Sequence, residues 1–154
     1  SVDTQYLSQE KKNELEAERK QLKEEKIPEI AVRIDEAKQL GDLSENAEYH
    51  DARDQMAWAQ SRLLEIDAIL HNAEIIIPGG SGDGTVTIGS TVVVKVGGKE
   101  KEYRIVGAQE ADPLSGKISN ESPLGEAFMG RKKGDKVEVE VPAGVQEYKI
   151  IKVT

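Results

Sequence analysis

Apolar or small residues recur at alternating steps of three and four in the second quarter of the chain, and this spacing restricts the fold. It is the a/d pattern of a coiled coil, and it continues over about three heptads. The pattern predicts a long helix whose narrow apolar seam packs against a second helix. The seam positions are Tyr49, Ala52, Met56, Ala59, Leu63, Ile66 and Leu70.

The residues before position 41 supply the second helix, because they are rich in strong helix formers with interleaved opposite charges. Pro28 removes one helical hydrogen bond and is expected to kink this arm. Gly41 is typical of a helix end, and Asp42 or Ser44 is suited to cap the next helix. The two arms are therefore expected to fold back antiparallel. The apolar stripe of the first arm consists of Leu15, Leu22, Ile30, Ile34 and Ala37.

The second half of the chain changes to the two-residue period of β-strands. Gly97-Gly98 and Ala143-Gly144 are typical of hairpin turns. Ser122, followed by a proline and later by Gly130, predicts one short capped helix. Strands are expected over residues 85–88, 90–96, 102–106, 136–141 and 146–153.

These patterns predict an α+β protein of two domains. Residues 1–77 form a helical coiled-coil hairpin, and the glycine-rich residues 78–84 form a linker. Residues 85–154 form a small domain with an antiparallel sheet and one short helix.

Charge and composition exclude several classes of function. The net charge of −8 comes from residues 1–75, which hold 10 basic and 18 acidic side chains, whereas the remaining residues are balanced. Such a surface disfavours autonomous binding of nucleic acid, although a local patch could touch nucleic acid held by a partner. Without cysteine there is no disulfide and no thiolate metal site. Since no apolar run is long enough to span a bilayer, we expect a cytoplasmic protein without a membrane partner.

The turn between the two helices carries the candidate site. Asp42 and Glu45 can face the same way across a tight turn, where their oxygens could share one divalent cation. An alternative is a capping box that opens the second helix. Lys38 and Arg53 flank the turn, either as partners of nearby acids or as groups that steady a phosphate.

Three segments resemble the GreA/GreB family of bacterial transcript cleavage factors. They are GDLSENAEYHDAR at residues 41–53, YRIVG at 103–107 and ISNESPLGEAFMGRKKGD at 118–135. The resemblance covers essentially the whole chain. It implies an N-terminal antiparallel coiled coil and an FKBP-like C-terminal domain that docks on RNA polymerase near its secondary channel.

The resemblance also implies residue roles. Asp42 and Glu45 would reach the polymerase active site and help to hold its second Mg²⁺ and a water, so that backtracked nascent RNA is hydrolysed. The protein would act as a monomer, with no nuclease activity and no bound metal of its own. The group near the displaced RNA would be Lys38, Tyr49 and Arg53, and the polymerase-docking group would be Ser119, Glu121 and Pro123.

Two positions depart from the family pattern. Position 38 is Lys where Arg is common, and position 44 is Ser where many members have Lys. Both changes weaken or remove positive charge beside the turn, which bears on RNA capture more than on the chemistry.

Three other functions fit parts of the sequence. An inhibitory Gre-like paralogue would share both domains, but such proteins crowd extra acids into the turn, where this chain has Leu43 and Ser44. A prolyl isomerase would follow from an FKBP-like domain, yet few aromatic residues are present to stack on proline. The third is a coiled-coil interaction protein in which the two acids have no metal role.

Overall fold

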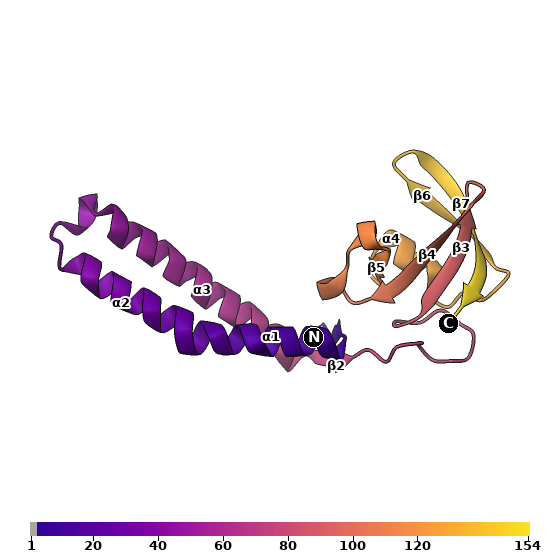
Figure 1. Cartoon of the computed structure of the whole chain (residues 1–154). Coiled ribbons are helices and arrows are strands. Elements are labelled where there is room, and N and C mark those ends of the chain that lie inside the picture. The colour runs from indigo at the N-terminus through magenta and orange to yellow at the C-terminus, as the bar shows by residue number, and fades with distance from the viewer. Residues whose placement is uncertain (1–2) are drawn as a thin grey trace. The chain divides into compact units, whose positions relative to one another are not determined.

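The computed structural model describes residues 3–154, which form two compact units (Figure 1). One unit is Lys12–Asn72, and the other combines the chain up to Lys11 with Ala73–Thr154. The predicted α+β class with an N-terminal helical region is confirmed. The division differs from the predicted boundaries, because residues 3–11 and 73–77, which the sequence predicted to be in the helical domain, belong to the sheet-bearing unit. Residues 1 and 2 of the predicted helical domain lie outside the described range.

The helical hairpin has an ascending arm and a descending arm, and α3 runs back along α2 (Figure 1). Of the predicted seam, Ala52, Ala59 and Ile66 are buried and the other positions are half-buried, so the coiled-coil prediction is confirmed. Ile69 is buried as well, although it lies outside the a/d pattern. The elements are α1 (Gln9–Gln21), a π-helical turn η1 (Leu22–Lys26), α2 (Ile27–Lys38), a 3₁₀ turn η2 (Leu43–Glu45) and α3 (Ala47–His71).

Near Pro28, where the sequence predicted a kink, the structure has the π turn η1 just before the proline. The Ile27 N–H donates to the Leu22 carbonyl, five residues back, so one wide turn replaces a regular one. Pro28 then occupies the first turn of α2, where a missing N–H matters least. The ascending arm stays helical from Gln9 to Lys38.

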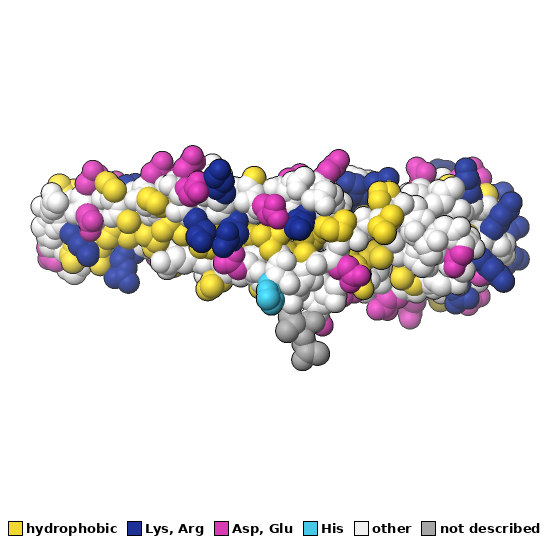
Figure 2. Space-filling model, turned by 90° about the horizontal axis from the view of Figure 1, so that it is seen from below, with side chains coloured by type: hydrophobic (Ala, Val, Ile, Leu, Met, Phe, Trp, Pro, Cys, Tyr) yellow, Lys and Arg dark blue, Asp and Glu magenta, His cyan; other side chains and the backbone are white. Residues whose placement is uncertain are grey.

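The large apolar side chains on the outside of the hairpin are Val32, Leu40, Trp58 and Leu64. Trp58 is 59% exposed and lines a shallow groove with Ile30 and Ala59. On the face shown in Figure 2, apolar side chains lie between acidic and basic ones along the hairpin. Within residues 3–154, none of the helices is both long and apolar enough to cross a membrane.

The second unit contains a five-stranded sheet in the order β5-β4-β3-β7-β6. Its core is built around Phe128, whose ring lies 5.9 Å from that of Tyr103 and 5.6 Å from that of Tyr148. Gly97 and Gly98 both have positive φ, as a tight hairpin turn requires. The strands are β3 (Thr91–Val96), β4 (Lys99–Val106), β5 (Lys117–Ser119), β6 (Lys136–Val141) and β7 (Gly144–Val153).

Two details of this sheet differ from the prediction. Residues 85–88 do not form a strand; Thr85 makes an isolated bridge to Lys132 while Val86 is buried in the core. The sheet is not wholly antiparallel, because β5 pairs parallel with β4. A loop with two 3₁₀ turns, Ala108–Glu110 and Pro113–Ser115, supplies the crossover that a parallel pair needs.

The predicted short helix is confirmed as α4 (Pro123–Phe128). Its N-cap is Ser122, whose hydroxyl accepts a hydrogen bond from the Gly125 N–H at 3.1 Å, and Gly130 follows the helix with positive φ. Gly125 lies so close to the Ser119 carbonyl that a Cβ there would approach its oxygen to 1.9 Å. The helix therefore packs directly on the end of β5.

The sequence did not predict the pairing of β1 (Gln5–Leu7) with β2 (Ala73–Ile75), a parallel pair of two short strands. Leu7 is fully buried, and the Ser8 backbone N–H donates to the Glu110 carboxylate at 2.8 Å. These contacts join the N-terminal segment to the sheet-bearing unit.

Burial of the seam predicts a clear difference between two neighbouring residues of α3. Ile66 is fully buried and Leu64 is 71% exposed. We expect Ile66→Ala to lower the free energy of unfolding by about 2–5 kcal/mol, because it leaves a cavity in the seam. The matched Leu64→Ala should change it by less than about 0.5 kcal/mol. Urea unfolding followed by circular dichroism measures both, and equal losses would contradict the assigned seam.

Candidate functional site

The site is the tip of the hairpin, where a short connection joins α2 to α3. Gly41 has φ of 118°, which lets the chain leave the end of α2, and η2 follows at once. Asp42 is the N-cap of this 3₁₀ segment and Glu45 is its last residue, and both are exposed. The tip thus presents two carboxylates to the solvent within one tight turn.

Asp42 caps the 3₁₀ turn and not the long helix. Its Oδ1 accepts hydrogen bonds from the Ser44 backbone N–H at 3.0 Å and from the Ser44 hydroxyl at 2.9 Å. Both bonds end on the same oxygen, so Oδ2 accepts neither of them. Among the described residues, the Glu45 carboxylate makes no hydrogen bond or ion pair.

The helix cap is a residue that the sequence interpretation missed. Helix α3 starts at Ala47, and its N-cap is Asn46, whose Oδ1 accepts from the Tyr49 N–H at 3.1 Å. The prediction of Asp42 or Ser44 as the cap of the second helix is wrong, because both lie too early in the chain. The capping box fails for the same reason, since Glu45 precedes the helix. Asn directly before a helix former was the signal available in the sequence.

The hydrogen bonds from Ser44 also affect the pKa of the Asp42 carboxyl group. Donation from the Ser44 backbone N–H, and then from its hydroxyl, lowers the pKa of Asp42 below its ordinary value of 3.8. Because the folded-state pKa is lowered, the carboxylate persists to lower pH and is lost only as the pH falls through that lowered value. Asp42 is therefore ready to donate oxygen to a cation at neutral pH.

Two carboxylates make only part of a metal site. Mg²⁺ prefers six oxygen ligands in octahedral geometry. Residues 3–154 contain no group of three or more His, Cys, Asp or Glu side chains arranged to hold a metal ion. Among the described residues, the tip therefore offers two carboxylates and no third side chain of these types beside them.

The basic residues of the tip are arranged differently from the prediction. Arg53 does not pair with Glu48 or Asp51; its Nη1 donates to the Tyr49 hydroxyl at 3.0 Å, and its guanidinium lies 5.7 Å from the centre of the Tyr49 ring. In this i,i+4 pair of α3, Arg53 is exposed and Tyr49 is half-buried, and Lys38 is exposed at the end of α2. The two cationic side chains thus lie on the two helices that the tip connects.

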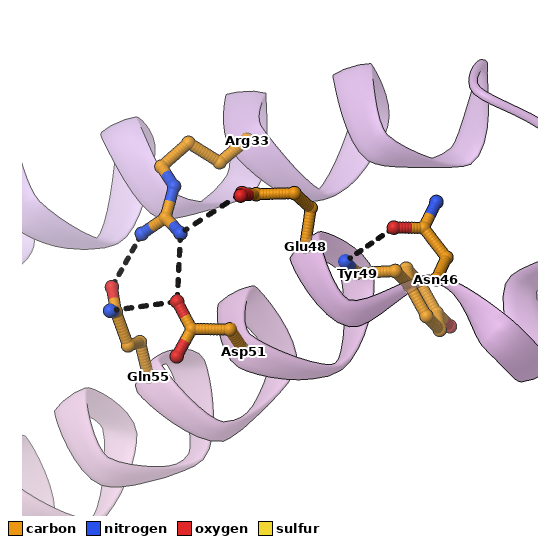
Figure 3. A network of polar contacts seen from close by, with 6 residues as sticks. All are labelled: Arg33, Asn46, Glu48, Tyr49, Asp51 and Gln55. Carbon is orange, nitrogen blue, oxygen red and sulfur yellow. Dashed lines mark hydrogen bonds and ion pairs between the residues drawn. The ribbon is translucent and has the colours of Figure 1, made fainter.

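The acids of α3 are bound instead by Arg33 of α2, which the sequence did not single out (Figure 3). Its guanidinium lies 3.1 Å from Asp51 Oδ2 and 4.0 Å from Glu48 Oε2, and it also donates to Gln55. The network ties the two arms together just below the tip. Only the fold brings residues so far apart in sequence into contact.

The predicted polymerase-docking residues lie at the junction of β5 and α4. Glu121 and Pro123 are exposed, and Pro123 is the first residue of α4. Ser119 is 9% exposed, and its hydroxyl accepts from the Glu121 N–H at 3.0 Å. Ser119 thus shapes the turn that presents the other two side chains.

Sequence comparison places both halves of the chain in one family. Residues 5–75 match the model described as transcription elongation factor, N-terminal, and residues 81–154 match transcription elongation factor, GreA/GreB, C-term. The chain belongs to the GreA/GreB family. The family resemblance seen in the sequence is thereby confirmed.

Individual relatives of the GreA/GreB family are similar over almost the full length. Transcription elongation factor GreA of Thermotoga neapolitana is 45% identical over 150 residues, 96% of each chain. The factor of the same name from Listeria welshimeri is 42% identical, covering 96% of this chain and 94% of the relative.

Solved structures in the GreA/GreB family show lower similarity. GreA factor homolog 1 of Thermus thermophilus is 23% identical, with 99% of each chain covered and a TM-score of 0.45. A GreA/GreB structure from Nitrosomonas europaea is 32% identical, with 60% of this chain and 78% of that chain covered and a TM-score of 0.43. Membership rests on the sequence matches.

The dependence of the Asp42 pKa on its hydrogen bonds from Ser44 can be tested by mutation. We expect Ser44→Ala to raise the pKa of Asp42 because one of its two donors is lost, while the remaining backbone N–H keeps it below the ordinary value. A pH titration of the carboxyl carbons by NMR measures the change. Asp83 is an internal control, since its pKa of about 2 depends first on Ser81 and then on Thr85. An unchanged Asp42 pKa would contradict the cap geometry.

Proposed function

We propose that this protein stimulates the hydrolytic cleavage of backtracked nascent RNA by bacterial RNA polymerase. The observation that carries the proposal is the exposed pair Asp42 and Glu45 on the tip of a helical hairpin. The hairpin enters the secondary channel of the polymerase, and the tip reaches the active site. Cleavage there releases the displaced 3′ segment and lets an arrested complex resume synthesis.

Two-metal phosphodiester hydrolysis explains why two carboxylates suffice. The attacking and the leaving oxygen are each stabilised by a cation, with the two cations roughly 3.5–4 Å apart. A polymerase that binds its second Mg²⁺ weakly gains affinity for it when Asp42 Oδ2 and the Glu45 carboxylate are added. One of the added oxygens also orients the attacking water.

The catalytic centre belongs to the polymerase, and this chain activates it. The tip lacks the further ligands that a complete magnesium site needs, among the described residues. In this proposal the protein is not a nuclease alone, and it shares Mg²⁺ only inside the complex. It acts as a monomer in the bacterial cytoplasm, where the polymerase works.

The cationic side chains of the tip are suited to the displaced RNA. The Arg53 guanidinium donates a hydrogen bond to the Tyr49 hydroxyl. Because the hydroxyl is neutral, this bond does not neutralise the positive charge of Arg53. Arg53 and Lys38 can attract a phosphate, and the Tyr49 ring offers a surface for a base. This arrangement holds RNA beside the carboxylates.

The exposed residues of the β5–α4 junction are suited to docking on the rim of the polymerase channel. Glu121 and Pro123 project from a turn that Ser119 and Ser122 hold in shape. In this proposal the sheet-bearing unit binds the rim of the polymerase channel, and the hairpin extends to the active site. The tip also lacks the additional acids of an inhibitory paralogue, since positions 43 and 44 are Leu and Ser.

Removing either charge of the tip tests the proposal. We expect Asp42→Asn and Glu45→Gln each to lower cleavage of a stalled, backtracked complex by at least about tenfold, since each loses a metal ligand. RNA fragments are measured on a gel at saturating factor, with polymerase binding measured separately.

Asp54→Asn is the matched control, because it removes the same charge from an exposed position of α3 away from the tip. Wild-type cleavage by both tip variants with intact binding would refute the ligand role. Cleavage of naked RNA by this chain alone would show that it is a nuclease.

A second experiment tests docking. We expect Glu121→Lys to weaken polymerase binding roughly tenfold, or about 1.4 kcal/mol, with a smaller loss for Pro123→Ala. Glu138→Lys makes the same charge change on β6 and should bind as wild type. Equilibrium binding to labelled polymerase measures the effect. Unchanged binding of both junction variants would remove this docking surface.

A further inference from the structure

Asn46 uses both ends of its side-chain amide at the tip. Its Oδ1 accepts from the Tyr49 N–H at 3.1 Å, which caps α3. Its Nδ2 donates to the Ala37 carbonyl at 2.8 Å, near the end of α2. Figure 3 shows the first of these bonds, at the start of the α3 ribbon. One side chain therefore connects the end of one helix to the beginning of the next.

The two carboxylates lie inside the loop that this side chain closes. Residues 38–45 connect Ala37 to Asn46, and both Asp42 and Glu45 are among them. The base of the loop is well fixed, because Ala37 is 3% exposed and its carbonyl also accepts from the Leu40 N–H at 3.1 Å. The Asn46 N–H adds a weaker bond to the Leu43 carbonyl at 3.4 Å.

Above that base the tip has few contacts of its own. Asp42, Ser44 and Glu45 are exposed, and the 3₁₀ turn is held by bonds within the turn and by a His50 Nε2 contact of 3.3 Å to the Ser44 carbonyl. Loops with little buried surface sample many conformations. The bond from Asn46 to Ala37 restrains the span of the loop and so the position of its acids.

Other capping residues cannot make both bonds. Serine caps a helix well, but its single hydroxyl cannot also reach the Ala37 carbonyl. Aspartate accepts from Tyr49, yet as a carboxylate it has no hydrogen to donate and would set an oxygen against the carbonyl. Asparagine provides an acceptor and a donor on a short side chain with few rotamers.

We propose that Asn46 is a positioning residue for the tip carboxylates: by closing the loop, it holds Asp42 and Glu45 where they bind the metal of the polymerase. The proposal rests on the proposed function and deepens it. Asn46 touches no reacting atom and is not itself catalytic. Its effect is on geometry, and a displacement of about 1 Å at a reacting centre can lower a rate about 100-fold.

The kinetic test compares Asn46→Ser and Asn46→Asp with wild type in the polymerase cleavage assay, over a range of factor concentrations. We expect the maximal rate at saturating factor to fall about tenfold or more in both, with the half-saturating concentration unchanged within about twofold. Both variants retain a capping oxygen, so the helix content and melting temperature of the hairpin should stay close to wild type.

The matched control is Asn72→Ser at the other end of α3. Asn72 Nδ2 also donates to a helix carbonyl, that of Ala68 at 2.8 Å, but it lies far along the helix from the tip. We expect this variant to cleave as wild type. A wild-type maximal rate in Asn46→Ser, or a loss confined to the half-saturating concentration, would overturn the proposal.

A measurement without polymerase separates this proposal from the proposed function. Backbone ¹⁵N relaxation of the free protein should show lower order parameters for residues 40–45 in Asn46→Ser, and unchanged values in Asn72→Ser. If wild type failed to stimulate cleavage, the proposed function would be wrong, and the relaxation data would still decide whether Asn46 orders the loop. Unchanged order parameters in Asn46→Ser would overturn the positioning role.

Discussion

Burial of one apolar seam between two antiparallel arms is the interaction on which the hairpin depends. Ala52, Ala59 and Ile66 of α3 are buried, as are Leu22 and Ile30 of the ascending arm, and α3 packs against η1 and α2. Small residues at the seam let the helices approach closely, and Arg33 adds polar contacts across the arms near the tip. A two-helix rod has no other core, so the placement of the tip residues follows from this seam and from the bonds that close the loop.

The two units are stabilised in different ways, the sheet-bearing unit by a buried core and the tip of the hairpin by local hydrogen bonds. The sheet-bearing unit has a closed core around Phe128 and presents a firm turn at the β5–α4 junction. The hairpin keeps its polar groups outside and carries its reactive groups at the end, where contacts are few. The proposed function requires a carboxylate that is exposed; Asp42 is exposed, and its bonds to Ser44 lower its pKa. Local order at the tip is therefore supplied by hydrogen bonds and not by burial.

Periodic patterns made the long elements predictable, and contacts distant in sequence were not. The seam of α3, the strands β3, β6 and β7, and the cap and end of α4 follow from spacing and turn chemistry. Strands β1, β2 and β5 have three residues each, too few to show a period, and they exist because partners far along the chain pair with them. At the tip, the carboxylates were evident from their types and spacing. The roles of Asn46 and Arg33 depend on which residues the antiparallel fold brings opposite each other.

The parallel pairing of β1 with β2 has a consequence for the architecture. In the sequence, the ascending arm follows β1 and the descending arm is followed by β2. The hairpin is therefore an insertion between two strands of the sheet-bearing unit that pair with each other. Insertions of this type can change length without altering the strands that anchor them. Adding or removing one heptad from each arm would shift the acidic end by about 10.5 Å while keeping the seam in register. The length of the hairpin can thus change independently of the strands that attach it to the sheet-bearing unit.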